Sequence, residues 1–276
     1  MGSTALGKNE NDGRRPLRIL GIPVSSLTMS ETVDRVVRWG ASNGRASHGR
    51  MVFATTVHGL IEGYRDSSFR EILTQAAMVT PDGMPLVWLG NLHGHAEMER
   101  VDGPTLMLKV CEESQRVRVR HFFYGGAPGV AEELAATLKE RFPGIQIAGC
   151  YSPPFRPLTE SEKVGVTRRI NDSGADIVWV GLGTPKQERW AMEMRSRVEA
   201  QVLITVGAAY DFHTGRVKRA PRWLQKTGLE WVYRLWQEPR RLWRRYLSTN
   251  PLFVALVLME YLRVWTPTPA GTGHGK

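Results

Sequence analysis

Residues 175–198 read ADIVWVGLGTPKQERWAMEMRSRV, and this stretch decides the fold class. Its four apolar residues, 177–180, form a run typical of a strand that is buried on both faces of a sheet. The Gly-Leu-Gly that follows ends the strand, and Thr184 and Pro185 open a helix over the remaining residues. A buried strand that leads directly into a helix is the repeating unit of parallel sheets.

The same unit recurs along the chain. Apolar runs that lead into helical patterns begin at GRMVFATTV, MVTPDG, RVRHFFYGG and IQIAGCY, and QVLITV closes the series. A shorter strand within LRILGIPV is followed by a turn and then by a helix, for which Ser30 is the expected N-cap. The pattern predicts an α/β fold: a doubly wound, mostly parallel, Rossmann-like sheet with helices on both faces.

Length and composition set the domain plan. An apolar content of 42% in 276 residues supports one sizeable core with room for an appendage. The two cysteines, Cys111 and Cys150, have neither metal-ligand spacing nor a disulfide framework, which favours a reducing compartment. We expect four segments: a disordered leader over residues 1–16, an α/β domain over 17–215, a helical appendage over 216–266 and a disordered tail over 267–276.

The net charge of +10 is concentrated near the C-terminus. Between Arg216 and Arg245, ten Lys and Arg residues face only two acidic residues, Glu230 and Glu238. Within this stretch, RAPRWLQKTGLEWVYRLWQEPRRLWRRYL places tryptophans among the arginines. Such a patch suits a nucleic acid, a membrane surface or a partner protein.

Ligands of open α/β sheets bind at the carboxyl ends of the strands, so the loops there are the candidate site. In YGGAPG, Gly125 and Gly126 either permit a tight turn or aim backbone N–H groups at a phosphate. In GLGTPKQE, Gly183 allows close approach of a ligand. Lys186 follows in the first helical turn, where a cation opposes the helix dipole but suits a diphosphate ligand.

Three titratable residues also stand at strand ends. In TPDG, Asp82 is either the N-cap of the next helix or a carboxylate able to take a proton from an attacking hydroxyl. His58 and His213 are each either a hydrogen-bonded loop residue or a catalytic group. No cluster of His, Cys and Asp has metal-ligand spacing, so we expect neither a metal site nor a cofactor.

Several of these loops together resemble one family. TPDGMPLVWLGNLHG, ERVDGPTLM, GLGTPKQE, YDFHTGRVKRAPRWLQKTGLEW and RLWQEPRR follow one another as in the WecG/TagA/CpsF glycosyltransferases, glycosyltransferase family 26. The resemblance implies an inverting, metal-independent hexosyltransferase that moves a sugar of the N-acetylmannosamine, uronic acid or glucose type. The donor would be a UDP-sugar, and the acceptor a polyprenyl-diphosphate-linked saccharide such as one on undecaprenyl diphosphate. The product would belong to a cell-surface polysaccharide or exopolysaccharide.

The resemblance also assigns roles to residues. Asp82 would be the base that deprotonates the acceptor hydroxyl, and Thr56, which falls where the family commonly has Asn, is the second catalytic candidate. Arg100 would neutralise the leaving diphosphate. The other residues expected at the donor and its diphosphate are Thr55, Gly83, Gly125, Gly126, Gly183, Pro185, Lys186, Gln187 and Asp211.

The appendage is interpreted as a membrane contact. PRRLWRRYL predicts a helix that begins at Pro239, with Arg240/Arg244 and Arg241/Arg245 as i,i+4 pairs. Basic amphipathic helices with Trp and Tyr bind anionic lipid, whereas the apolar run over residues 252–259 is too short to span a bilayer. The residues expected on the membrane or acceptor side are Arg219, Trp231, Arg234, Arg240, Arg241, Trp243, Arg244 and Arg245.

Together these features predict a peripheral enzyme at the cytoplasmic face of the inner (plasma) membrane that binds no nucleic acid. Two other interpretations stay open: a non-catalytic nucleotide- or nucleic-acid-binding α/β module, and a solvated basic helical hairpin whose tryptophans lie in the core. A homo-oligomer also stays open, because the apolar residues after Pro251 suit a second subunit as well as lipid. The pattern does not decide whether the appendage folds over the strand-end loops.

Overall fold

The structure is a computed structural model that describes residues 15–42 and 48–265. Its centre is a six-stranded sheet in the order β4-β3-β8-β7-β5-β6, with every neighbouring pair parallel. The strands are β3 (Arg50–Thr55), β4 (Met78–Pro81), β5 (Arg120–Gly125), β6 (Gln146–Tyr151), β7 (Ile177–Gly181) and β8 (Val202–Thr205). The buried run that suggested a central strand is β7, which lies between β8 and β5.

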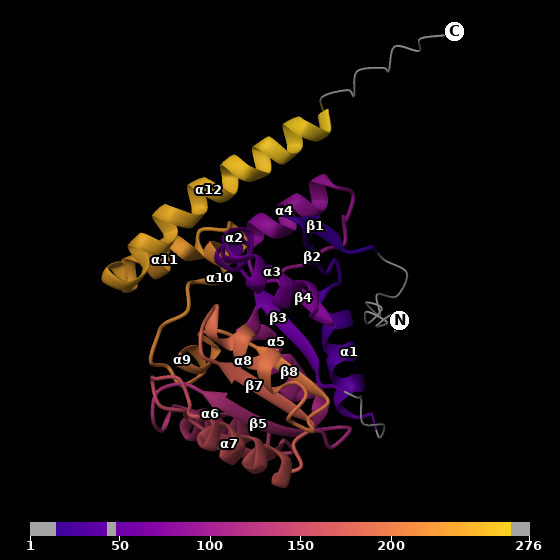
Figure 1. Cartoon of the computed structure of the whole chain (residues 1–276), viewed down its shortest axis with the longest axis vertical. Helices are drawn as coiled ribbons and strands as arrows, with labels where there is room; N and C mark the ends of the chain where they lie inside the picture. Colours follow the sequence, from indigo (N-terminus) through magenta and orange to yellow (C-terminus); the bar gives the residue numbers. More distant parts are fainter. Residues whose placement is uncertain (1–14, 43–47, 266–276) are drawn as a thin grey trace.

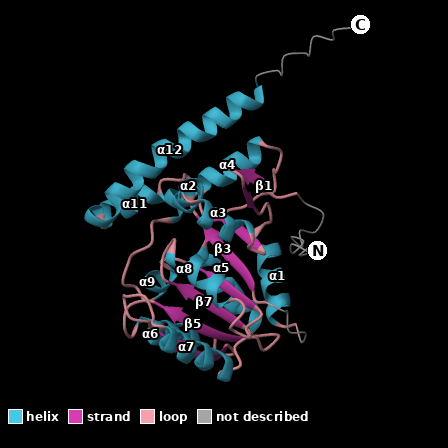
Figure 2. Cartoon of the chain, viewed as in Figure 1, coloured by secondary structure: helices cyan, strands magenta, loops and turns pink. Residues whose placement is uncertain are grey.

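Helices cover both faces of this sheet (Figure 2). Because side chains alternate along a strand, Met51 and Phe53 face one buried layer while Val52 faces the other. The first layer includes α2 (Val57–Arg65), α3 (Ser67–Thr74), α4 (Met84–Leu92), α7 (Glu160–Asp172) and α8 (Lys186–Met194). The second includes α1 (Met29–Gly40), α5 (Gly103–Ser114), α6 (Val130–Arg141) and α9 (Ala209–His213). The predicted doubly wound α/β fold is confirmed.

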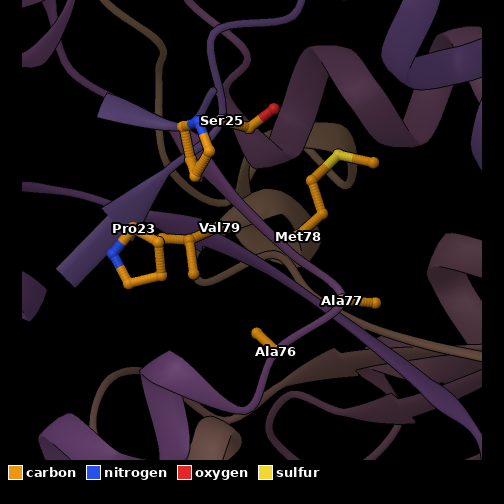
Figure 3. A pocket seen from close by; sticks show the side chains of 7 residues that line it. Pro23, Ser25, Ala76, Ala77, Met78 and Val79 are labelled. Atoms are coloured by element: carbon orange, nitrogen blue, oxygen red, sulfur yellow. The ribbon is translucent and has the colours of Figure 1, made fainter. Parts of the chain in front are cut away.

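The N-terminal strand differs from the prediction. LRILGIPV forms a separate antiparallel hairpin of β1 (Leu17–Ile19) and β2 (Ile22–Val24), turned by Leu20 and Gly21, which both have positive φ. A cavity of about 10 Å³ lies between this hairpin and the start of β4 (Figure 3). It has room for about one water molecule and none for a substrate. Its lining residues are Pro16, Pro23, Ser25, Ala76, Ala77, Met78 and Val79.

Helix caps explain two local boundaries. The N-cap of α1 is Thr28, not Ser30: the Thr28 hydroxyl accepts from the Glu31 N–H, and the Glu31 carboxylate accepts from the Thr28 N–H. The break between α2 and α3 falls at Asp66, whose carboxylate accepts from the Ser68 and Phe69 N–H groups.

Three helices follow the sheet domain: α10 (Arg222–Lys226), α11 (Glu230–Gln237) and α12 (Pro239–Trp265). We call residues 216–265 the C-terminal appendage. The predicted helix start at Pro239 is confirmed, and α12 continues past Pro251 across one end of the molecule (Figure 1). It packs on α2 and α11, its Leu242, Phe253 and Leu256 are buried, and Arg65 of α2 donates to the Ser248 carbonyl. Among the described residues no helix combines the length and apolar character needed to cross a membrane.

Parts of the domain plan lie outside the described residues. They are the leader up to residue 14, the final appendage residue 266 and the whole of the predicted tail, 267–276.

Candidate active site

Two neighbouring strand ends bring Thr55 and Asp82 together. β3 and β4 pair in parallel with Thr55 opposite Pro81, and the Asp82 N–H donates to the Thr55 carbonyl over 3.0 Å. The residue at the cap position of α4 is Gly83, and no side chain makes a capping hydrogen bond there. The N-cap interpretation of Asp82 is therefore wrong, and its carboxylate is directed to other partners.

The Asp82 carboxylate lies against the start of α5 with 17% of its side chain exposed. It accepts from the Arg100 Nη2 at 3.4 Å and from the Gly103 N–H at 3.5 Å. Burial raises the pKa of Asp82 to about 7, Asp102 and Glu230 add to the rise, and Arg100 and the Gly103 N–H oppose it. The pKa of this carboxyl therefore falls in the range that suits a general base near neutral pH.

The appendage closes over this edge of the sheet, which answers the question left open by the sequence. Arg100 Nη2 donates to Glu230 Oε2 of α11 at 2.6 Å. Arg219 donates to Asp102 Oδ1 at 2.6 Å, and its Nε lies 3.8 Å from Glu230 Oε1. We call these five residues the charge network: Asp82, Arg100, Asp102, Arg219 and Glu230. It contains four contacts between opposite charges. Two of them, Arg100–Glu230 and Arg219–Asp102, join the sheet domain to the appendage.

The two threonines after β3 differ in exposure. Thr55 is buried, and its hydroxyl donates to the Phe53 carbonyl. Thr56 is exposed at the N-cap position of α2, where its side chain makes no capping hydrogen bond. Of the two hydroxyl groups, the one on Thr56 is therefore better placed to meet a substrate.

The glycine turn after β5 lies far from Asp82. Three strands separate β4 from β5, which corresponds to roughly 19 Å at the usual strand spacing. Gly125 has φ +135°, and a Cβ there would come 2.4 Å from the Gly181 carbonyl oxygen; at Gly126 a Cβ would come 2.9 Å from Val130. The fold accounts for both glycines, and one diphosphate cannot contact both this turn and the charge network.

The loop after β7 mixes structural and exposed residues. Gln187 is buried, donates to Glu188 and accepts from the Gly207 N–H at 3.1 Å, so it ties the ends of β7 and β8 together. Pro185 precedes α8, and Lys186 is exposed in its first turn. Gly183 has φ +76° with no atom within 4 Å of a built Cβ, so its turn geometry alone requires glycine.

Gly83 has no such requirement. A Cβ there would meet only ordinary van der Waals contacts, the nearest being Pro85 Cδ at 3.7 Å. Nothing in the fold itself therefore calls for glycine at this position.

The remaining strand-end groups lie beneath the appendage. Asp211 of α9 is half-buried, and burial raises its pKa, with Glu238 adding to the rise and Arg241 opposing it. Burial, with Arg245 and Arg65 nearby, lowers the pKa of His58 to about 4, which leaves this ring neutral at pH 7.

His213 of α9 hydrogen-bonds to the backbone of α5. A ring nitrogen donates to the Pro104 carbonyl over 3.0 Å, and burial lowers its pKa. The ring is hydrogen-bonded, as one of its two interpretations expected, but His213 is the last residue of α9 and does not lie in a loop. Across the described residues, no three or more His, Cys, Asp and Glu side chains gather as a metal-binding group.

The predicted membrane-side arginines differ in their partners. Arg219, Arg234 and Arg241 have acidic partners, and the Arg234 guanidinium also lies over the Phe212 ring. Arg240 and Arg244 are exposed on the outer face of α12.

Arg245 is also exposed on α12, and its charge helps to lower the pKa of His58. Trp231 packs edge-on against Tyr246 but stays 38% exposed, and Trp243 is 45% exposed.

The sequence did not single out Asp102 or Glu230. Asp102 carried one visible signal, since an aspartate before Gly-Pro at a helix start is a common N-cap, and it does cap α5 through the Thr105 N–H. Glu230 carried another: it is one of only two acidic residues between Arg216 and Arg245.

Comparison with known proteins places this chain in a family. Residues 17–266 match the family model described as "Glycosyl transferase WecG/TagA/CpsF family". The chain is 34% identical over 197 residues to an N-acetylglucosaminyldiphosphoundecaprenol N-acetyl-beta-D-mannosaminyltransferase of Bacillus spizizenii strain W23, which covers 71% of this chain and 74% of that protein. A protein of the same name from Bacillus subtilis strain 168 is 30% identical over 196 residues, again covering 71% of this chain and 74% of the relative. The chain therefore belongs to the WecG/TagA/CpsF family of glycosyl transferases.

Proposed function

We propose that the protein is an inverting glycosyltransferase that moves an N-acetylmannosamine-type sugar from a UDP-sugar to a polyprenyl-diphosphate-linked N-acetylglucosamine. The names of its relatives support this acceptor and this sugar. The observation that carries the proposal is the Asp82 carboxylate at the end of β4, with its pKa raised to about 7 beside Arg100.

Asp82 is the general base of this reaction. It takes the proton from the acceptor hydroxyl as that oxygen attacks the anomeric carbon of the donor. The bond between the anomeric carbon and the diphosphate oxygen breaks, UDP leaves with the bonding electrons, and attack from the opposite side inverts the configuration. The exposed Thr56 hydroxyl at the next strand end is a second polar contact for the reacting sugar.

Arg100 and Arg219 neutralise the leaving diphosphate. Each guanidinium has five N–H donors, and the contacts within the charge network use only some of them. Two fixed guanidinium groups can stabilise negative charge that develops on the leaving oxygen, which is the task of a metal ion in other transferases. We therefore propose that transfer does not depend on a divalent metal.

The acceptor is met at a membrane surface, on the cytoplasmic face in this proposal. The appendage exposes Trp223, Trp236 and Trp243 to solvent, with exposed Arg240 and Arg244 on α12. Indole rings favour the headgroup region, and guanidinium groups attract anionic lipid. A carrier lipid held in the bilayer would then present its saccharide at the edge of the sheet where the appendage meets Asp82.

A transfer assay tests the proposal. The protein is incubated with a panel of UDP-sugars and a short-chain polyprenyl-diphosphate N-acetylglucosamine, with excess chelator, and products are analysed by mass and by NMR of the new glycosidic bond. We expect one donor to give a disaccharide product of inverted configuration in the presence of chelator. Tight, salt-dependent binding to DNA or RNA with no UDP-sugar binding would instead favour the non-catalytic module.

A further inference from the structure

One guanidinium serves two carboxylates in the charge network. Arg100 Nη2 lies 2.6 Å from Glu230 Oε2 but 3.4 Å from Asp82 Oδ1. All three side chains are at most 17% exposed, so solvent screens these contacts poorly. Arg100 therefore interacts more strongly with the Glu230 carboxylate than with the Asp82 carboxylate.

The fold holds Glu230 in this place. Gly228, in the turn between α10 and α11, has φ +71° and packs on α4, where a Cβ would come 2.6 Å from Trp88 and 3.3 Å from Met84. This close contact lies two residues before Glu230, the first residue of α11. The position of the Glu230 carboxylate is therefore set by packing of the appendage on the sheet domain.

Of the three carboxylates in the charge network, Asp82 has the longest contact with a guanidinium group. Three carboxylates share two guanidinium groups, and Asp102 and Glu230 each hold a contact of 2.6 Å. The charged and polar groups that face Asp82 are Arg100, Asp102, Glu230 and the Gly103 N–H, and the pKa of Asp82 is raised to about 7. With one negative charge in excess, a proton goes to the carboxylate that has the least cationic support.

We propose that Glu230 is a positioning residue of the transfer reaction: its carboxylate holds Arg100 away from Asp82 and thereby keeps Asp82 basic enough to take the acceptor proton. This inference rests on the proposed role of Asp82. It implies that the docked appendage activates the base as well as covering it, because the other hydrogen bonds of Arg100 among the described residues go to Asp82 itself.

The Glu230→Gln variant tests this inference through the pH profile. The amide keeps an acceptor for Arg100 but removes the charge, so Arg100 turns to Asp82 and stabilises its ionised form. We expect the acid limb of the kcat/KM profile to move down by about one pH unit, which raises the ratio of the rates at pH 6 and pH 8 about fivefold. The plateau rate falls because Asp82 becomes a weaker base.

Glu238→Gln is the matched control. Glu238 directly follows the same helix and pairs with Arg234 and Arg241, and it makes no ion pair with Arg100. This variant should leave the acid limb in place. A uniform loss of rate in Glu230→Gln, with the acid limb of wild type, would overturn the inference and leave Glu230 a purely structural contact.

A second measurement does not depend on transfer. Thermal unfolding at several pH values measures how much Asp82→Asn stabilises the protein. This gain in stability rises with pH and becomes constant above the pKa of Asp82 in the folded protein. The inference expects this plateau at about pH 7 in the wild-type background and about one unit lower in the Glu230→Gln background. An unchanged plateau would refute the role of Glu230. If the plateau shifts but the protein transfers no sugar, Glu230 still keeps Asp82 basic, and the proposed function is refuted.

Discussion

Replacing Asp82 by Asn should make the protein more stable at neutral pH while it removes transfer. The pKa of Asp82 is raised from 3.8 to about 7 in the fold, so the folded state holds a proton that the unfolded chain has already lost. Stability is therefore lost as pH rises from about 4 to 7, and the loss stays constant above 7. An asparagine is neutral at every pH and avoids this loss.

The size of the effect follows from the pKa difference. About three pKa units correspond to about 4 kcal/mol at 1.36 kcal/mol per unit, which is an upper bound. The side chain is 17% exposed, and an amide in its place loses part of the contact with Arg100, so about 2 kcal/mol is the expected gain at pH 8. For a chain of this size that gain raises Tm by about 4–8 °C.

Thermal unfolding of wild type and Asp82→Asn from pH 5 to pH 8 measures this gain. Asp34→Asn is the control, because it removes the same charge from an exposed position on α1 and should change stability by less than about 0.5 kcal/mol. The variant should unfold at a higher temperature than wild type at pH 8, with a smaller difference at pH 5. A variant that is less stable than wild type at pH 8, or a difference that does not change with pH, would refute the reasoning.

Three further predictions concern the site, the fold and the membrane. The kcat/KM of wild-type transfer should fall on the acid side with an apparent pKa of about 7, since Asp82 must be ionised to act, and a flat profile between pH 5.5 and 8 would contradict this. Gly125→Ala should cost at least about 2 kcal/mol in chemical denaturation, because a Cβ would clash with the Gly181 carbonyl, whereas Gly165→Ala on α7, with no atom within 4 Å, should stabilise by about 0.5–1 kcal/mol. Arg240→Gln combined with Arg244→Gln should weaken sedimentation with anionic vesicles by about tenfold or more, whereas Arg116→Gln combined with Arg118→Gln, which precede β5, should leave it unchanged.

The sheet was predictable because its strands carry their own signal. β7 and β8 are buried on both faces, so their apolar runs stand out from the amphipathic helices around them. The hairpin was missed because its two strands have only three residues each, too few to show an alternating pattern on either side of the turn at Leu20 and Gly21. Thr28 was missed although T-x-x-E is a capping-box pattern, because Ser30 stands closer to the first apolar residue of the helix.

The site was predictable only in part. Asp82, Thr56 and Arg100 lie on loops at or after adjacent strand ends, where a parallel sheet brings ligand-binding groups together. The glycine turn of β5 shares the sequence character of a phosphate loop, but strand order, which no local pattern encodes, places it far from Asp82. Glu230 reaches Arg100 across 130 residues, and this contact depends on how the appendage packs on the sheet domain, including Gly228 on Trp88.

The most direct test of the central claim compares single-turnover transfer by wild type and Asp82→Asn. Both proteins receive the same UDP-sugar and short-chain lipid-diphosphate acceptor, with chelator, and UDP binding is measured in parallel. The variant should bind UDP as wild type does but transfer at least about 100-fold more slowly. Transfer by Asp82→Asn within tenfold of the wild-type rate would contradict the assignment of Asp82 as the base.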